Sequence, residues 1–320
     1  MTTRREVLAA LGGLLPVMAL QPPSAAAAVR DSIGAAVGAG LLEHHPDFPS
    51  RQVLARDVWV WRPPGYAATG PVHDVLYFHD GANLFEPGRA FGGEEWGVDE
   101  TLASLIASGS VPPTLVVGIG NTRRRFREYM PEGLWSALPV AQRAAVTRSH
   151  GGEPLSARYL RFITRELVPW VQSRYRVSAD PARTHIAGSS MGGLISLAAL
   201  VEHPEVFGSA ACLSTHWPCL APSSLDPRPA AEVAGVAEAL RQWVTPHLPA
   251  LRGHRLYLDR GDATLDVLYP PFQDRVDAWL ATVAAPAGLR VTSRVFPGGE
   301  HSERAWRARL AEPLRFLLNP

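Results

Sequence analysis

The sequence has few cysteines, almost no excess of charge of one sign and, after its first residues, no apolar run long enough to cross a bilayer. Its two cysteines lack the His and Cys neighbours of a zinc site, so no metal or other cofactor is predicted. The formal net charge of +1 gives no electrostatic reason to expect nucleic acid as a partner. These features argue against zinc-binding, nucleic-acid-binding and membrane-embedded proteins.

The two cysteines, Cys212 and Cys219, are close enough in the chain to form a disulfide. An exported location would permit one. The apolar context of Cys212 (SAACLST) favours a buried, small hydrophobic side chain instead. The sequence leaves both possibilities open.

The first residues have the order of an export signal. Arg4 and Arg5 precede an apolar run from Val7 to Leu20, and small residues follow at positions 24–28. The adjacent arginines resemble a twin-arginine signal. We therefore predict a signal peptide at residues 1–28 and an exported protein, periplasmic or secreted, with no stable membrane insertion after cleavage. The alternative is an anchor that is never cleaved.

The rest of the chain reads as one globular domain, residues 29–320. Of the whole sequence, 46% is hydrophobic and 19% is charged, as expected for a globular protein. No internal repeat or linker divides this part. Its length is sufficient for a large, well-buried core.

Short apolar runs typical of strands alternate with helical patterns, which predicts a mostly parallel sheet with helices on both faces. The expected strands are Gln52–Trp61, Val72–His79, Thr114–Ile119, His185–Ala187, Ser209–Leu213, Arg255–Leu258 and Val291–Phe296. The expected helices are Val98–Ala107, Ala157–Gln172, Leu194–His203, Pro271–Val283 and Glu303–Leu318.

Two segments break this alternation, Asn121–Glu153 and His216–Glu232, and both follow expected strands. Loops after the strands of an open α/β sheet build its ligand crevice. We expect these segments to contact substrate. The alternative is that they are surface connections.

Residues 188–192 form a G-x-S-x-G motif, directly after an expected strand and directly before an expected helix. On such a strand-to-helix turn the serine hydroxyl stands above the sheet edge, and the glycines make room for the tight backbone. The helix N-terminus adds positive potential for a developing oxyanion. The motif in this context predicts an α/β-hydrolase fold with Ser190 as the nucleophile.

A serine nucleophile needs a base and an acid that orients the base. This fold has the chain order Ser, Asp or Glu, then His. His301 follows the last expected strand and is the predicted base. Asp259, Asp262 and Asp266 follow the strand that should deliver the acid, and the pattern alone does not choose among them.

The oxyanion hole needs two backbone N–H groups. One is expected from Met191, the residue after the nucleophile. The second is expected from Gly81 or Ala82, in the loop after an early strand. Asp80, in the same loop, precedes the serine and is predicted to fix the loop.

Several segments together resemble the esterase family of α/β-hydrolases that includes enterochelin esterase and esterase D. The resemblance covers nearly all of the chain from about Arg51, and in similar sequences a Leu-Asp pair often follows the acid strand. This match favours Asp266, although this sequence has Asp262 where relatives have Thr. The matching segments are YFHDGANLF, VVGIGNTRRRFREYMP, GSSMGGL with EHPEVFG, LYLDRGDATLD and PGGEHSERAW.

The resemblance implies a serine-dependent carboxylic ester hydrolase that acts on a small-molecule ester through an acyl-enzyme. An acyltransferase with the same residues and an exported, non-catalytic binding module are the alternatives. Arg124, from a cluster of arginines, and Trp217 are candidate substrate contacts. A solvated charge run is the other interpretation of the arginine cluster.

Overall fold

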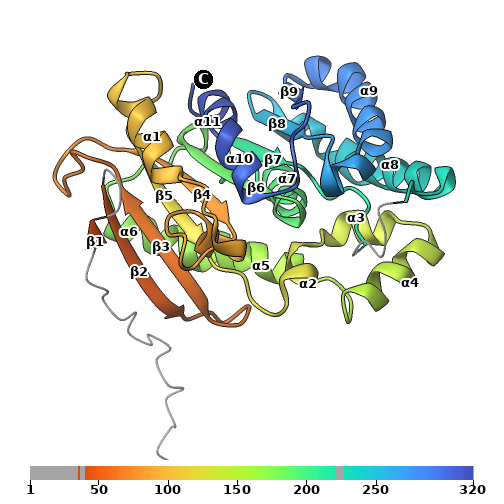
Figure 1. Cartoon of the computed structure of the whole chain (residues 1–320), viewed down its shortest axis with the longest axis horizontal. Helices are drawn as coiled ribbons and strands as arrows, with labels where there is room; N and C mark the ends of the chain where they lie inside the picture. Colours follow the sequence, from red (N-terminus) through yellow and green to blue (C-terminus); the bar gives the residue numbers. More distant parts are fainter. Residues whose placement is uncertain (1–34, 37–39, 221–225, 320) are drawn as a thin grey trace, which may run out of the picture.

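The computed structural model describes residues 35–36, 40–220 and 226–319 (Figure 1). The predicted export signal at residues 1–28 lies outside this part of the chain. Within it, the helices do not combine the length and hydropathy that a bilayer-spanning segment needs.

The strands of the described residues form one sheet in the order β1-β2-β3-β5-β4-β6-β7-β8-β9. β2, β3 and β5 pair antiparallel, whereas every pairing from β5 to β9 is parallel. The strands are β1 (Ala35–Ala36), β2 (Leu41–Phe48), β3 (Arg56–Arg62), β4 (Asp74–His79), β5 (Thr114–Ile119), β6 (Thr184–Ser189), β7 (Ser209–Leu213), β8 (Arg255–Arg260) and β9 (Arg290–Val295).

Helices cover both faces of this sheet (Figure 1). α1, α10 and α11 lie on one face, and α5, α6 and α7 lie on the other. The helices are α1 (Val98–Ala107), α2 (Arg125–Tyr129), α3 (Glu132–Ala137), α4 (Val140–Ser149), α5 (Ser156–Phe162), α6 (Val168–Arg174), α7 (Met191–Glu202), α8 (Ala230–Val244), α9 (Pro270–Ala287), α10 (Glu303–Arg309) and α11 (Ala311–Leu318).

The central strands are buried on both faces because their alternating side chains enter two different cores. In β4, Val75 and Tyr77 join the core beneath α5 to α9, while Leu76 and Phe78 join the core beneath α1, α10 and α11. The predicted α/β-hydrolase architecture, a mostly parallel sheet with helices on both faces, is confirmed.

One part of the expected fold was wrong. The segment Asn121–Glu153 is not a loop, because it contains α2, α3 and α4. In the second segment, residues 221–225 lie outside the described part, and its described beginning is buried. The long helix expected over Ala157–Gln172 is confirmed: it consists of α5 and α6, which are joined by one wider helical turn at Ile163–Leu167.

Sequence reasoning also omitted β2 and α8. Half of the residues of β2 (LLEHHPDF) are polar, and β2 lies on the antiparallel side of the sheet, so it lacks the continuous apolar run of the central strands. Both cysteines are free and buried, so Cys212 and Cys219 form no disulfide in this structure.

Candidate active site

Ser190 occupies a strained turn between β6 and α7. Its backbone has φ 58° and ψ −123°, a region that non-glycine residues rarely adopt and that is common at functional sites. A Cβ at Gly188 would lie 2.8 Å from the carbonyl oxygen of Gly192, so this compact turn requires glycine. The G-x-S-x-G pattern therefore reflects a steric need of the local backbone.

Backbone hydrogen bonds hold this turn at the ends of the parallel strands. The Ser190 N–H donates to the Leu213 carbonyl at 2.9 Å, and the His216 N–H donates to the Ser190 carbonyl at 3.1 Å. α7 begins at Met191, and the first N–H groups of a helix have no acceptor within the helix. The Met191 N–H is thus available at the turn that presents the serine.

Asp266 and His301 are in direct contact. His301 Nδ1 lies 2.6 Å from Asp266 Oδ1, and the second carboxylate oxygen accepts hydrogen bonds from Ser214 Oγ and the Gly261 N–H, each at 2.6 Å. Burial acts to raise the pKa of Asp266, but the hydrogen bond and charge of His301, helped by Ser214 and Gly261, lower it below its usual value. The carboxylate is therefore kept ionised beside the imidazole.

The other two aspartates of this segment have different partners. Asp259 is buried and pairs with Arg309 at 3.0 Å, and it also accepts from the Ser214 N–H. Asp262 accepts from the Gly298 N–H at 2.6 Å. Of the three candidates, Asp266 is the one that the structure brings to His301.

Ser190 and His301 line one cavity of about 380 Å³ at the edge of the sheet. Asp266 holds Nδ1 of the imidazole, so Nε2 is the nitrogen left for other partners. Within the described residues, Ser190 Oγ and His301 do not form a hydrogen bond. The other side chains of the lining are polar or aromatic: Asp80, Asn83, Phe91, Asn121, Arg125, Phe126, Ser189, Glu303 and Trp306.

The loop after β4 lies beside this turn. A Cβ at Gly192 would be 3.5 Å from Asp80 Oδ2, and a Cβ at Gly81 would lie 2.6 Å from the Gly118 backbone. Gly81 begins a short 3-10 turn, so its N–H and that of Ala82 lack an acceptor within the turn. Ala82 lines an adjoining groove that shares Asn121 with the cavity.

Asp80 anchors this loop, in agreement with the sequence prediction. Arg125 donates to both of its carboxylate oxygens, from Nε at 2.8 Å and from Nη2 at 2.7 Å, and Asn121 Nδ2 donates at 2.7 Å. Burial acts to raise the pKa of Asp80, but the charge of Arg125 lowers it. The bidentate pair fixes both the loop and the start of α2.

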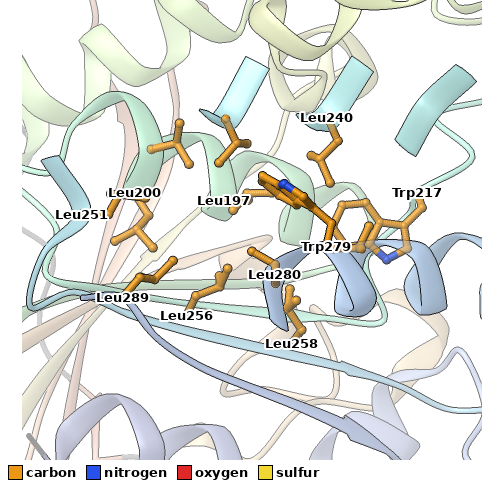
Figure 2. A pocket seen from close by; sticks show the side chains of 13 residues that line it. Leu197, Leu200, Trp217, Leu240, Leu251, Leu256, Leu258, Trp279, Leu280 and Leu289 are labelled. Atoms are coloured by element: carbon orange, nitrogen blue, oxygen red, sulfur yellow. The ribbon is translucent and has the colours of Figure 1, made fainter. Parts of the chain in front are cut away.

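Neither predicted substrate contact lies on the cavity. Arg124 is half-buried at the start of α2, and the neighbouring Arg125 lines the cavity instead. Trp217 is 1% exposed and donates to Gln273 Oε1 at 2.7 Å. Figure 2 shows Trp217 among leucine side chains around a different, apolar space of about 10 Å³, which is too small for a substrate.

Sequence reasoning did not single out several side chains that surround the candidate triad. Tyr269 is buried, and its hydroxyl donates to His216 Nδ1 at 2.8 Å, because His216 Nε2 donates to the Leu220 carbonyl. The Tyr269 ring lies 5.7 Å from that of His301. The Trp306 ring lies 4.9 Å from the His301 ring, and its Nε1 donates to Ser214 Oγ at 3.0 Å. Trp306 follows the predicted base by five residues, and this closeness in sequence was the available signal.

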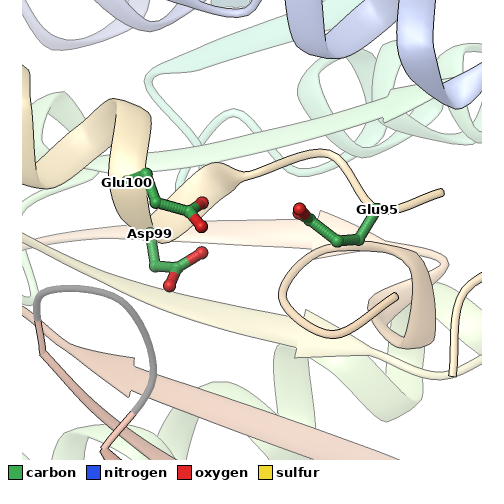
Figure 3. Close-up of side chains that lie close together, drawn as sticks. All are labelled: Glu95, Asp99 and Glu100. Carbon is green, nitrogen blue, oxygen red and sulfur yellow. The ribbon is translucent and has the colours of Figure 1, made fainter. Parts of the chain in front are cut away.

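A group of acidic side chains lies outside the cavity lining. Glu95, Asp99 and Glu100 have carboxylate oxygens within 4.8 Å of one another (Figure 3). Burial and the neighbouring Glu100 raise the pKa of Asp99 to about 7. Arg307 donates to Glu95 and so balances part of this charge. Because Arg307 belongs to α10 and Glu95 to the segment before α1, their contact ties that segment to α10.

Comparison with known proteins gives a family match over most of the chain. The model of a family described as "Putative esterase" matches residues 55–317. The iron(III) enterobactin esterase of Dickeya dadantii is 28% identical over 193 residues, which are 59% of this chain and 41% of that protein. The chain spans between 38% and 56% of the length of the curated relatives that it matches.

Solved structures share the fold at lower identity. An IroE-like serine hydrolase from Shewanella oneidensis superposes with a TM-score of 0.61 at 20% identity, covering 87% of this chain and 80% of that one. A ferulic acid esterase superposes with a TM-score of 0.58 at 19% identity, covering 88% and 98% of the two chains.

Proposed function

The chain belongs to this esterase family of α/β-hydrolases, and we propose that it hydrolyses carboxylic esters through an acyl-enzyme formed on Ser190, with His301 as the base and Asp266 as the orienting acid. The observation that carries the proposal is the 2.6 Å contact between His301 and Asp266 at the cavity that Ser190 also lines. This contact and the shared cavity support a Ser-Asp-His triad whose members lie far apart in the sequence.

In the first half of the reaction, Ser190 Oγ attacks the ester carbonyl carbon while His301 Nε2 takes the hydroxyl proton. The tetrahedral intermediate then breaks its bond to the leaving alkoxide, which receives that proton from His301. The acyl group remains on Ser190. The reaction requires the hydroxyl and the imidazole to meet, and such hydrogen bonds are often long until substrate is bound.

In the second half, a water molecule replaces the alcohol. His301 takes a proton from the water, the resulting hydroxide adds to the acyl carbon, and the proton returns to Ser190 Oγ as the carboxylic acid leaves. Asp266 accepts from His301 Nδ1 throughout and stabilises the imidazolium that forms in each half. Its buried hydrogen bonds to Ser214 and Gly261 favour its ionised form.

The backbone N–H of Met191 and that of Gly81 or Ala82 are the proposed oxyanion donors. In support, these groups lie at the beginnings of α7 and of the short turn after β4, and Gly192 brings the two segments close together. The Asp80–Arg125 pair holds the second donor in place. Preorganised donors of this kind contribute about 2.7–4 kcal/mol each to transition-state stabilisation.

The test is turnover of p-nitrophenyl acetate by the wild-type protein and by Ser190→Ala. We expect the substitution to lower kcat by roughly 10⁴-fold or more, because it removes the atom that forms the acyl-enzyme. Circular dichroism of both proteins controls for folding. Near-normal turnover by Ser190→Ala would reject the proposed nucleophile.

We also propose that residues 1–28 are an export signal, of the twin-arginine type, and that residues 29–320 form the exported domain. The support is the order of charged, apolar and small residues at the N-terminus. N-terminal sequencing of the exported protein should begin near residue 28 or 29. A protein that retains Met1 would reject the cleavage.

A further inference from the structure

From the charges that line the Ser190 cavity, and resting on the proposed function, we infer that its substrate is a neutral or cationic ester and that esters with an anionic group are selected against. Three charged side chains other than His301 line the cavity: Asp80, Arg125 and Glu303. Two are acidic and one is basic. The lining therefore has an excess of negative charge.

The single arginine of the lining is already engaged. Arg125 gives one hydrogen bond to each carboxylate oxygen of Asp80, which is itself buried. To bind a substrate carboxylate, Arg125 would have to leave Asp80 and abandon a buried charge, which is strongly unfavourable. A bidentate pair of this kind fixes the loop, so the described lining of the cavity offers no unpaired arginine to an anionic substrate.

Glu303, unlike Asp80, has no arginine partner in the described part of the cavity lining. It lies half-buried at the start of α10, and Asn83 Nδ2 donates to its Oε1 at 3.3 Å. In the described part of the chain no arginine forms an ion pair with it. Burial raises the pKa of Glu303; the charge of His301 acts to lower it, and the nearby charges of Asp80 and Glu94 act to raise it. A cationic group in the cavity would relieve this repulsion.

Aromatic side chains complete the surface that a substrate would meet. Phe91 is 79% exposed and Phe126 is 42% exposed, although both line the cavity. Trp306 adds a third ring beside His301. Aromatic faces attract cations and pack against apolar groups, but they do not solvate anions. The rings and the unbalanced carboxylate thus favour the same class of substrate.

The direct test uses three acetate esters of similar size and different charge. Acetylcholine is cationic, 3,3-dimethylbutyl acetate is its neutral counterpart and 4-acetoxybutanoate is anionic. We expect kcat/KM to be highest for the cationic or neutral ester and roughly tenfold or more lower for the anionic one at low salt. Added salt should narrow the difference, because it screens exposed charges.

Two variants test whether the charge of Glu303 causes the preference for cationic over anionic esters. Glu303→Gln keeps an acceptor for Asn83 but removes the charge, and it should reduce the cationic-to-anionic ratio of kcat/KM about fivefold. Arg304→Gln is the matched control, because Arg304 is exposed, pairs with Glu300 and does not line the cavity. It should leave the ratio unchanged. An unaltered ratio in Glu303→Gln, or an anionic ester that is turned over as well as the neutral one, would overturn the inference.

Binding to Ser190→Ala separates this inference from the proposed function. Calorimetry with the same three esters measures Kd without turnover. The cationic ester should bind at least about fivefold more tightly than the anionic one. Equal or reversed affinities would reject the charge preference, whether or not Ser190 proves to be the nucleophile.

Discussion

Asn83 and Glu303 connect the loop after β4 to the helix that follows His301. Asn83 Nδ2 donates to Glu303 Oε1 at 3.3 Å, and Asn83 Oδ1 accepts from the Phe91 N–H at 3.0 Å. The first segment is proposed to supply an oxyanion donor and the second follows the proposed base by two residues. This bridge therefore sets how the two halves of the site face each other.

We predict that Asn83→Asp lowers kcat for a neutral ester about tenfold, because it places a second carboxylate against Glu303. Adding Glu303→Gln should recover most of the loss, since the new amide can donate to the new carboxylate. The measurement is a double-mutant cycle on kcat and KM. If the double variant is no faster than Asn83→Asp alone, the bridge has no positioning role.

Asp266→Asn should lower kcat by roughly 10³- to 10⁴-fold, because an amide can stabilise the wrong tautomer of His301 and does not stabilise the imidazolium. Asp262→Asn is the matched control on the same loop, where the carboxylate accepts from the Gly298 N–H and does not contact His301 in the described structure. Its kcat should stay within a few-fold of wild type. The reverse ranking of the two variants would assign the acid to Asp262.

Two buried histidines and one half-buried histidine predict how stability depends on pH. Burial lowers the pKa of His79 to about 3 and the pKa values of His150 and His216 to about 4. Unfolding returns each imidazole to a pKa near 6.5, so the unfolded chain takes up protons below that pH. These three histidines should therefore lower the free energy of unfolding as pH drops from about 6.5 to 5, by up to roughly 1.4 kcal/mol per pH unit each. Asp99 and Glu202, whose pKa values burial raises to about 7, act in the opposite direction and offset part of this fall.

Urea titrations at several pH values between 5 and 7.5 measure this slope, in a range where most carboxylates are still ionised. His216→Gln should make the dependence of the free energy of unfolding on pH shallower, by up to the roughly 1.4 kcal/mol per pH unit that one histidine contributes. A His216→Gln variant with the same slope as the wild type would contradict a buried, neutral imidazole at this position.

The features that sequence predicted are those decided locally. Thr114–Ile119 is β5 with the expected bounds, because a continuous apolar run suits a strand buried on both faces. The turn at Ser190 needs small residues at fixed offsets, so its pattern is visible in the chain. The order of the elements was sufficient to place His301 after the last strand.

The features that sequence missed depend on packing between distant segments. Trp217 was a candidate substrate contact, but Gln273 and the leucines around α7 hold its indole in the core. The choice of Asp266 depended on a resemblance, because the residues that tie it to His301 come from other strands and loops. Likewise, only the fold shows that Arg125 rather than Arg124 reaches the cavity.

The most direct test of the central claim is labelling with a fluorophosphonate probe, followed by mass spectrometry of the modified peptide. The account predicts one label, on Ser190, with loss of esterase activity in proportion to labelling and no labelling of Ser190→Ala. Labelling that is absent, or that falls on another residue while activity is lost, would contradict the assignment of Ser190 as the nucleophile.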